Sequence, residues 1–330
     1  MKKKVLVTGA TGFLGSNLVV MLHNLGYDIR VIVRPGSDTS TIKDIPCEVQ
    51  VGFIDKKEDV IKAVQGCEVV IHTASVTEQW GIDYETYERI NITATKYIAD
   101  ACLQQNIGRL VYVSTANTIG PGSLQHPGTE LNGFTLFKVN SPYINTKYLA
   151  QQYVIEQAEC KRLNAVVVNP TFMIGPNDVK PSSGKLLLYG IGKKVLFYPP
   201  GGKNFVYIQD VCKGIISAID RGRSGNCCLL AGENMSYKQF FGMVGKIAGE
   251  QKLMIRIPAF ALKGAGLIGS LLKKLGLKNL RLTYGAARLL CLDNYYSGNR
   301  SERELGIKYA PAEQAMRDAY DWFKHNGYIK

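Results

Sequence analysis

The amino-acid sequence predicts an α/β protein: a doubly wound parallel sheet followed by a smaller, mostly helical C-terminal domain. Short apolar runs alternate with helical patterns through the first half of the chain. These runs lack polar alternation, which is typical of parallel strands buried on both faces. After residue 170 the alternation gives way to clustered prolines and glycines, and from about residue 234 the pattern is mostly helical.

The elements of the first half follow one another in regular order. The predicted strands cover residues 5–7, 29–33, 69–72, 110–114 and 165–169. The predicted helices cover residues 12–25, 57–64, 87–104 and 142–160. Because successive parallel strands need a crossover connection, each helix is expected to pack on a face of the sheet.

The change of pattern also predicts the domains. Residues 1–170 form the first domain, and a strand-and-helix passage within 205–230 is expected to return to it. Residues 171–204 and 231–330 form a substrate-binding cap, whose early proline- and glycine-rich stretches are typical of loops over a site.

Composition limits the classes of partner. The formal net charge is +13, but the lysines and arginines are scattered, so we expect no nucleic-acid partner and a cationic surface around an anionic cofactor or substrate. None of the eight cysteines forms a Cys-x-x-Cys pair or has a histidine at zinc-ligand spacing, so no metal site is predicted and a cytoplasmic location is favoured. We find no secretion signal and no apolar run near the ~18 residues of a membrane span.

A glycine-rich turn follows the first strand. It reads Thr8-Gly9-Ala10-Thr11-Gly12-Phe13-Leu14-Gly15, three glycines at regular spacing between a strand and a helix. The first glycine permits the tight turn, the second lets the backbone approach a pyrophosphate, and the third allows close helix–strand packing. The helix N-terminus adds N–H donors and a positive dipole end. We interpret the segment as a dinucleotide site; the alternative is an ordinary glycine-containing turn.

The end of the second strand bears on which dinucleotide binds. An acidic residue there would bind the ribose 2′-hydroxyl of NAD, but this chain has Arg34. A guanidinium attracts a 2′-phosphate, so we favour NADP(H) over NAD(H). The alternative is a solvated surface arginine.

A second pattern, Tyr143-Ile144-Asn145-Thr146-Lys147, carries acid–base chemistry. Four-residue spacing places Tyr143 and Lys147 on one face of a helix. A nearby ammonium favours the phenolate, so we expect it to lower the tyrosine pKa toward a useful range. Ser114 and Thr115 end the preceding strand, where a hydroxyl could polarise a substrate oxygen or simply cap the strand.

Together these residues resemble the extended short-chain dehydrogenase/reductase superfamily, also called the NAD-dependent epimerase/dehydratase superfamily, over essentially the whole chain. The resemblance rests on the glycine turn, His72-Thr73-Ala74-Ser75, Asn91-Ile92-Thr93-Ala94-Thr95, Ser114-Thr115, and Tyr143 with Lys147. It implies a Rossmann fold with Tyr143 as general acid/base and Lys147 binding the nicotinamide ribose. It further implies that Thr115 holds the substrate oxygen, with Ser114 as the fallback, and that His72 and Asn91 are structural.

The resemblance also implies the binding residues. Those for the cofactor are Gly9, Thr11, Gly12, Phe13, Leu14, Gly15, Arg34, Ile54, Thr73, Ala74, Ser75, Tyr143, Lys147, Pro170 and Phe172. Those for the substrate are Val76, Trp80, Asn117, Met173 and Ile174. Because this lining is largely apolar, a hydrophobic carbonyl compound is favoured over a sugar nucleotide.

Within the superfamily, Asn169-Pro170-Thr171-Phe172-Met173-Ile174-Gly175-Pro176 is similar to the dihydroflavonol reductase-like branch, which includes 3β-hydroxysteroid dehydrogenase-like proteins. One departure is Phe53, where relatives usually carry an aspartate near the adenine.

Two other functions stay open at this point. A nucleotide-sugar epimerase or dehydratase would need a basic clamp, for which Lys203, Arg281, Arg288 and Arg300 are available. A non-catalytic NADP-sensing protein would not need the Tyr143–Lys147 pair.

Contacts with larger partners are also expectations. Residues 257–277 combine apolar residues with lysines; an amphipathic helix at a membrane surface is one interpretation, and a cap helix over the substrate pocket is the one we favour. By resemblance, helices 87–104 and 142–160 form a homodimer contact.

Overall fold

The computed structural model describes residues 3–78, 81–160, 163–275 and 282–329. A seven-stranded sheet, parallel throughout, has the order β10-β6-β5-β4-β1-β2-β3. Its strands are β1 (Lys4–Thr8), β2 (Asp28–Val33), β3 (Glu48–Val51), β4 (Val69–His72), β5 (Arg109–Val113), β6 (Ala165–Pro170) and β10 (Cys227–Leu230). The chain runs outward from β1 to β3 and starts again at β4, so the carboxyl ends of β1 and β4 flank the switch point where such sheets bind ligands.

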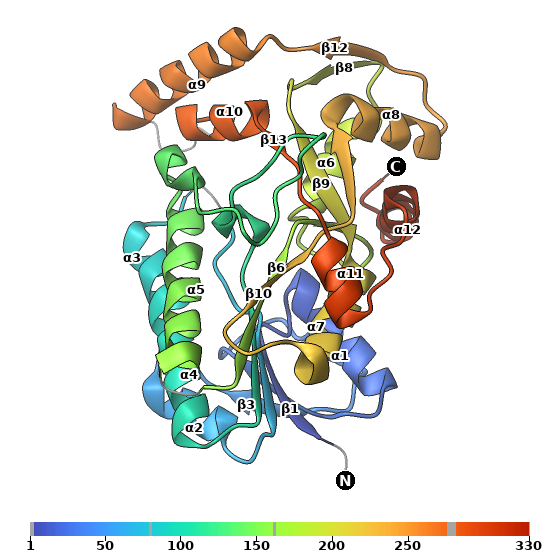
Figure 1. Cartoon of the computed structure of the whole chain (residues 1–330). Helices are drawn as coiled ribbons and strands as arrows, with labels where there is room; N and C mark the ends of the chain where they lie inside the picture. The colour runs from blue at the N-terminus through green and yellow to red at the C-terminus, as the bar shows by residue number, and fades with distance from the viewer. Residues whose placement is uncertain (1–2, 79–80, 161–162, 276–281, 330) are drawn as a thin grey trace.

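Helices cover both faces of this sheet (Figure 1). On one face lie α1 (Phe13–Asn24) and α7 (Ile208–Arg221); on the other lie α2 (Lys57–Val64), α4 (Ala94–Gln104) and α5 (Pro142–Cys160). Val5 and Val7 of β1 join the core on the α1 side, and Leu6 joins the core on the α4 side. Burial on both faces explains the unbroken apolar runs, and the predicted doubly wound sheet is confirmed.

The predicted helix over 87–104 is continuous but not uniform. It is built from α3 (Tyr84–Tyr87), a π-helical turn η2 (Glu88–Thr93) and α4. Short 3₁₀ turns occur at η1 (Ser40–Ile42), η3 (Ala116–Thr118) and η4 (Leu136–Val139). The π-helical turn contains Asn91, and such turns are frequent at functional sites.

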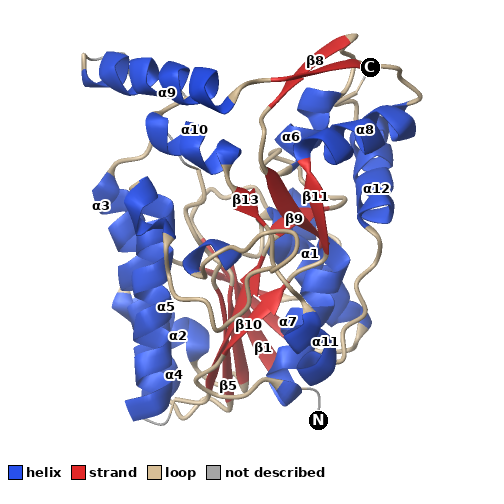
Figure 2. Cartoon of the chain, turned by 45° about the horizontal axis from the view of Figure 1, so that its top comes forward, coloured by secondary structure: helices blue, strands red, loops and turns tan. Residues whose placement is uncertain are grey.

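The C-terminal part is mostly helical, as predicted, around a small second sheet. That sheet holds β7 (Phe172–Ile174), β9 (Gly202–Tyr207), β11 (Glu233–Ser236) and β13 (Asp293–Asn294). Around its core lie α6 (Gly184–Gly190), α8 (Tyr237–Ala248) and α12 (Ala312–His325). A ribbon of β8 (Val195–Tyr198) and β12 (Leu253–Arg256), with α9 (Ala259–Lys274) and α10 (Tyr284–Cys291), lies at the end opposite the N-terminus (Figures 1 and 2).

Two details differ from the sequence expectations. The passage within 205–230 is split, because β9 pairs with β7, β11 and β13 of the small sheet. The return to the large sheet therefore begins with α7 and ends with β10. The helix α11 (Asn299–Leu305) also packs on the first domain, with Leu305 buried in the core beneath α7. No described helix is long and apolar enough to cross a membrane.

Candidate active site

The glycine turn joins β1 to α1 and lies against the loop after β4. Gly9 has φ of +72°, and a Cβ there would come within 2.8 Å of the main chain of Ala74. A Cβ on Gly15 would overlap the carbonyl oxygen of Gly9. A Cβ on Gly12, which is exposed, would meet only that oxygen, at 3.3 Å. The outer two glycines are therefore required by packing, and Gly12 keeps the surface in front of the helix open.

The start of α1 suits an anion. Gly12 precedes the helix and offers no side chain to cap it, and no acidic residue lies in the first turn. Phe13 and Leu14 turn their side chains into the core, which leaves the backbone N–H groups of the turn for a ligand. The residues present therefore fit a dinucleotide pyrophosphate.

Beside the turn, the loop after β4 is fixed by Thr8. The Thr73 hydroxyl donates to the Thr8 carbonyl at 2.7 Å, and the Thr8 hydroxyl accepts from the Ala74 N–H at 3.2 Å. The predicted cofactor residues Thr73 and Ala74 therefore border the glycine turn, and Ser75 follows them. Thr8 is a contributor that the sequence analysis missed, although its place as the last residue of the first strand was a signal.

His72 is a structural residue, as predicted. Its Nδ1 lies 2.7 Å from the Thr8 hydroxyl and its Nε2 lies 3.0 Å from the Thr95 hydroxyl, which itself donates to the Asn91 carbonyl. This pattern suits a neutral imidazole with its proton on Nε2. Burial, reinforced by the nearby Lys147 charge, lowers the pKa of His72 to about 3, so the ring is neutral at physiological pH.

Asn91 links the β4 loop to α5. Its side-chain oxygen accepts from the Ser75 hydroxyl at 3.0 Å and from the Val76 N–H at 2.8 Å. Its amide nitrogen donates to the Val76 carbonyl at 3.2 Å and to the Thr146 hydroxyl at 3.1 Å. All four positions of this buried amide group are thus engaged, and the loop is held to the helix that carries Tyr143 and Lys147.

Lys147 is 2% exposed and its ammonium is anchored from the side of the sheet. It donates to the Val113 carbonyl at 2.7 Å and lies 4.4 Å from the centroid of the Tyr112 ring. Burial lowers the pKa of Lys147 to about 7. Strand β5 and helix α5 are therefore joined by this side chain.

The expected direction of the Tyr143 pKa is wrong. Burial raises the pKa of Tyr143, and a hydrogen bond from the Thr115 side chain only partly opposes this effect. The sequence reasoning gave Lys147 a direct effect on the phenol, but its ammonium is engaged with Val113. The phenol is therefore protonated at neutral pH, which is the form that can donate a proton.

Of the two predicted hydroxyls, Thr115 is the one beside Tyr143. Its side-chain oxygen also accepts from the Asn117 N–H at 3.3 Å. The Ser114 hydroxyl is buried and has no hydrogen-bond partner among the described residues. The geometry therefore favours Thr115 over Ser114 as the group next to the phenol.

A buried network behind Thr115 was not predicted. Asn169 donates from its amide to the Thr115 carbonyl at 3.1 Å, to the Thr118 hydroxyl at 3.0 Å and to the Gln151 side chain at 2.7 Å. Gln151 lies on α5, one turn beyond Lys147. The strand β6, the turn η3 and the helix α5 are thus joined by hydrogen bonds behind Thr115.

At the other end of the predicted cofactor site, Arg34 follows β2 and is exposed. Its guanidinium makes no hydrogen bond or ion pair with any described residue. Ile54 follows β3 and packs partly against the core. The neighbouring Phe53 ring lies 4.8 Å from the Lys56 ammonium.

The predicted substrate residues differ in how far they are buried. Val76, Asn117 and Met173 are half-buried, whereas Ile174 is 2% exposed and belongs to the core of the C-terminal part. Trp80 lies outside the described residues. Pro170 ends β6 and is buried, and Phe172 begins β7 with its ring edge-on to Phe205 at 5.5 Å.

The residues proposed for a basic clamp are mostly engaged elsewhere. Arg288 donates to the Lys138 carbonyl, and Arg300 pairs with Glu304. Arg281 lies outside the described residues. The Lys203 ammonium lies 5.3 Å from the centroid of the Phe172 ring, and burial lowers its pKa to about 8.

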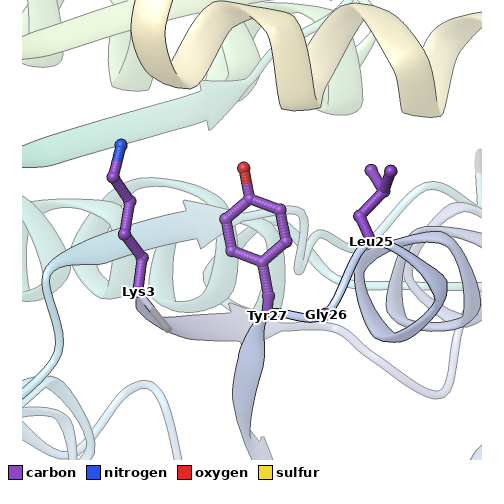
Figure 3. Close-up of a pocket in the computed structure, with 4 residues that line it drawn as sticks. All are labelled: Lys3, Leu25, Gly26 and Tyr27. Carbon is purple, nitrogen blue, oxygen red and sulfur yellow. The ribbon is translucent and has the colours of Figure 1, made fainter. Parts of the chain in front are cut away.

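A surface pocket of the structure lies away from these groups. It is lined by Lys3, Leu25, Gly26 and Tyr27, where β1 and β2 begin (Figure 3). The Gly9 turn, Ala74 and Thr115 follow the opposite, carboxyl ends of the strands. Because ligands of doubly wound sheets bind at the carboxyl ends, this pocket is not the candidate site.

The parallel sheet, the glycine turn and the Tyr143–Lys147 helix define an NAD(P)-dependent enzyme of the extended short-chain dehydrogenase/reductase type. The model of the NAD dependent epimerase/dehydratase family matches residues 5–229, and the chain belongs to that family.

Relatives cover the chain almost from end to end. It is 29% identical to a protein of Synechocystis sp. provisionally named dihydroflavonol 4-reductase, over 98% of this chain and 95% of the relative. It is 26% identical to a 3-beta-hydroxysteroid dehydrogenase of Mycolicibacterium neoaurum, over 97% of this chain and 91% of the relative. The crystal structure of gox2253 superposes with a TM-score of 0.89 at 30% identity and covers 100% of both chains. The predicted resemblance is confirmed.

Proposed function

We propose that this protein is an NADP(H)-dependent reductase or dehydrogenase that interconverts a carbonyl and a secondary alcohol on a hydrophobic small molecule. The observation that carries the proposal is the pairing of the half-buried Tyr143 phenol with the Thr115 side chain, on elements that Lys147 ties together. Thr115 follows the carboxyl end of β5. The neighbouring strand in the sheet is β4, and the loop after β4 contacts Gly9 of the glycine turn.

The chain's own groups have separate tasks in this reaction. A bound nicotinamide supplies or accepts the hydride. The Tyr143 hydroxyl gives its proton to the substrate oxygen during reduction and recovers it during oxidation. The Thr115 hydroxyl orients that oxygen, and Lys147 holds the nicotinamide ribose with the N–H bonds that Val113 leaves available. Because burial raises its pKa, Tyr143 is protonated at neutral pH, which is the form that donates a proton during reduction.

The preference for NADP(H) rests on Arg34. The guanidinium follows β2, where a ribose would lie, and the described residues give it no carboxylate partner. A 2′-phosphate would supply one, with two charge-assisted hydrogen bonds.

A hydrophobic substrate is supported by the apolar character of the surrounding residues. Val76, Met173 and Phe172 contribute aliphatic and aromatic surface near the ends of β4 and β6. The names of the relatives, a dihydroflavonol reductase and a hydroxysteroid dehydrogenase, describe polycyclic substrates of the same kind. The epimerase alternative is weakened because Arg288 and Arg300 are engaged with other protein groups.

The experiment is a turnover screen of hydrophobic ketones and of nucleotide sugars, each with NADPH and with NADH. Oxidation of NADPH by ketones, with little activity from NADH, is the expected result. Epimerisation of a nucleotide sugar without added cofactor, together with a nicotinamide cofactor retained through purification, would contradict the proposal and indicate an epimerase. NADPH binding without turnover of any substrate would favour a sensor.

A further inference from the structure

Helix α9 packs on α10 through its smallest residues. A Cβ added to Gly266 would come within 2.7 Å of the Ala287 side chain and 2.9 Å of the Thr283 carbonyl. A Cβ added to Gly269 would overlap the Leu282 carbonyl. The two helices thus approach closely along the face of α9 that carries these two glycines, with Leu262 buried one turn before Gly266.

Most large apolar residues of α9 face solvent instead, and Leu262 is the buried exception among those described. Phe260 is 80% exposed, Ile268 60% and Leu271 55%, and Leu267 is exposed beside them. These positions recur with the helical period, so they form one stripe along the helix. A helix in a water-soluble domain usually buries such residues and exposes its small or polar ones. The distribution in α9 is the reverse.

The ribbon that precedes α9 also has an exposed apolar face. Leu253 of β12 pairs with Val195 of β8, and Ile255 pairs with Phe197; all four side chains are exposed. Leu196 of β8 lies on the other face and is fully buried in the core of the C-terminal part. The outer faces of α9 and of this ribbon, here called the apolar edge, lie along the same end of the molecule (Figures 1 and 2).

The segment that carries most of the apolar edge has charges of one sign. Between Leu253 and Leu292 the sequence contains no Asp or Glu, and its basic residues are Arg256, Lys263, Lys273, Lys274, Lys278, Arg281 and Arg288. Arg256, Lys263 and Lys273 are exposed, and Lys194 is exposed directly before β8. Apolar residues flanked by cations are complementary to a surface with an apolar interior and anionic headgroups.

We propose that the apolar edge docks on an anionic lipid bilayer. The stripe of α9 and the outer side chains of the ribbon enter the headgroup region, while the flanking lysines and Arg256 pair with lipid phosphates. The helix lies in the plane of the interface, because no described helix is long and apolar enough to span a bilayer. The exposure of Phe260, Leu267, Ile268 and Leu271 thus favours the membrane-surface interpretation of residues 257–277 over that of a cap helix.

The test is flotation of the full chain with vesicles of phosphatidylcholine, alone or mixed with phosphatidylglycerol. The wild type should float with the anionic vesicles and bind the neutral ones about tenfold less. Leu271→Glu should reduce binding to the anionic vesicles about tenfold or more, because it places a charge in the stripe. Lys263→Gln should reduce it about fivefold, since each cation near such a surface contributes about that factor.

A matched control separates this effect from a general change of charge. Leu25 is 60% exposed at the opposite end of the molecule, beside the pocket of Figure 3, so Leu25→Glu should float as the wild type does. Unchanged circular dichroism and melting temperature would show that each variant is folded. The proposal would be overturned if, at low salt, the wild-type protein did not float with the anionic vesicles. It would also be overturned if a folded Leu271→Glu variant floated as the wild type does. A dimer that Leu271→Glu dissociates, without flotation, would assign the edge to a second copy.

Discussion

The ammonium of Lys147 and the carbonyl of Val113 are joined by a 2.7 Å hydrogen bond between α5 and the last residue of β5. Ser114 and Thr115 follow at once, and Tyr143 lies one helical turn before Lys147. The bond therefore fixes the distance between the phenol and its hydroxyl neighbour. The pair behaves as one rigid unit, which is what precise proton transfer requires.

The burial of Lys147 predicts a pH dependence of stability. Its pKa is lowered from 10.5 to about 7, so between these values the unfolded chain binds more protons than the folded chain. The free energy of unfolding should therefore gain from this group as pH rises through that window. In thermal melts, the wild type should gain stability relative to Lys147→Met between pH 7 and pH 9. Parallel pH profiles for the two proteins would contradict the buried, titrating ammonium.

The glycine turn predicts two different outcomes for similar substitutions. Gly12→Ala should leave the melting temperature nearly unchanged, because the new methyl group meets only one oxygen at 3.3 Å, yet weaken dinucleotide binding about tenfold or more. Gly15→Ala should lower the unfolding free energy by about 1–3 kcal/mol, because its methyl group overlaps the Gly9 carbonyl. Calorimetry measures the change in stability, and cofactor titration measures the change in dinucleotide affinity. Equal effects of the two variants on stability would be inconsistent with this turn.

Asn91 should matter for stability beyond what an amide on a helix usually contributes. Asn91→Ala removes four hydrogen bonds and leaves the Val76 N–H without its partner, so we expect a loss of about 2–4 kcal/mol. Asn164 is exposed, and its side chain bonds only to the Gly108 carbonyl among the described residues, so it is the control; Asn164→Ala should cost about 1 kcal/mol or less. Urea denaturation compares them. A similar small loss at both sites would count against the coupling role of Asn91.

Arg34 should decide between the two dinucleotides. Arg34→Ala should weaken NADPH binding roughly ten- to hundredfold, the value of a charge-assisted hydrogen bond, and leave NADH binding nearly unchanged. Arg223 is exposed beyond the C-terminus of α7, near the start of β6, and Arg223→Ala should affect neither cofactor. Fluorescence titration with both dinucleotides is sufficient. Equal losses for NADPH and NADH would remove the 2′-phosphate argument.

The elements with clear periodicity could be predicted from the sequence, and those without it could not. The strands around Val5, Val69 and Leu110 are apolar on both faces, so their pattern is unmistakable. β3 was not predicted because it is an edge strand, in which Val49 and Val51 are exposed and polar residues alternate with them. The split of 205–230 between two sheets was missed because pairing partners leave no mark on a short run of sequence.

In the site, residue identity was easier to predict than electrostatics. The neighbourhood of Tyr143, Lys147 and Thr115 follows from their places at a strand end and on one helical face. The direction of the Tyr143 pKa could not be predicted, because it depends on burial and on where the Lys147 ammonium finds its acceptor. The orientation of α9 was likewise not predicted, since Gly266 and Gly269 face α10 while Leu267 and Leu271 are exposed.

The proposal that Tyr143 donates the proton is tested most directly by Tyr143→Phe. The ring and its packing are retained, so NADPH should bind within about threefold of the wild-type affinity and the melting temperature should hold. Ketone reduction should fall about 10²- to 10⁴-fold, because only the proton donor is removed. Single-turnover oxidation of bound NADPH is the measurement. A rate close to that of the wild type, with binding intact, would contradict the account.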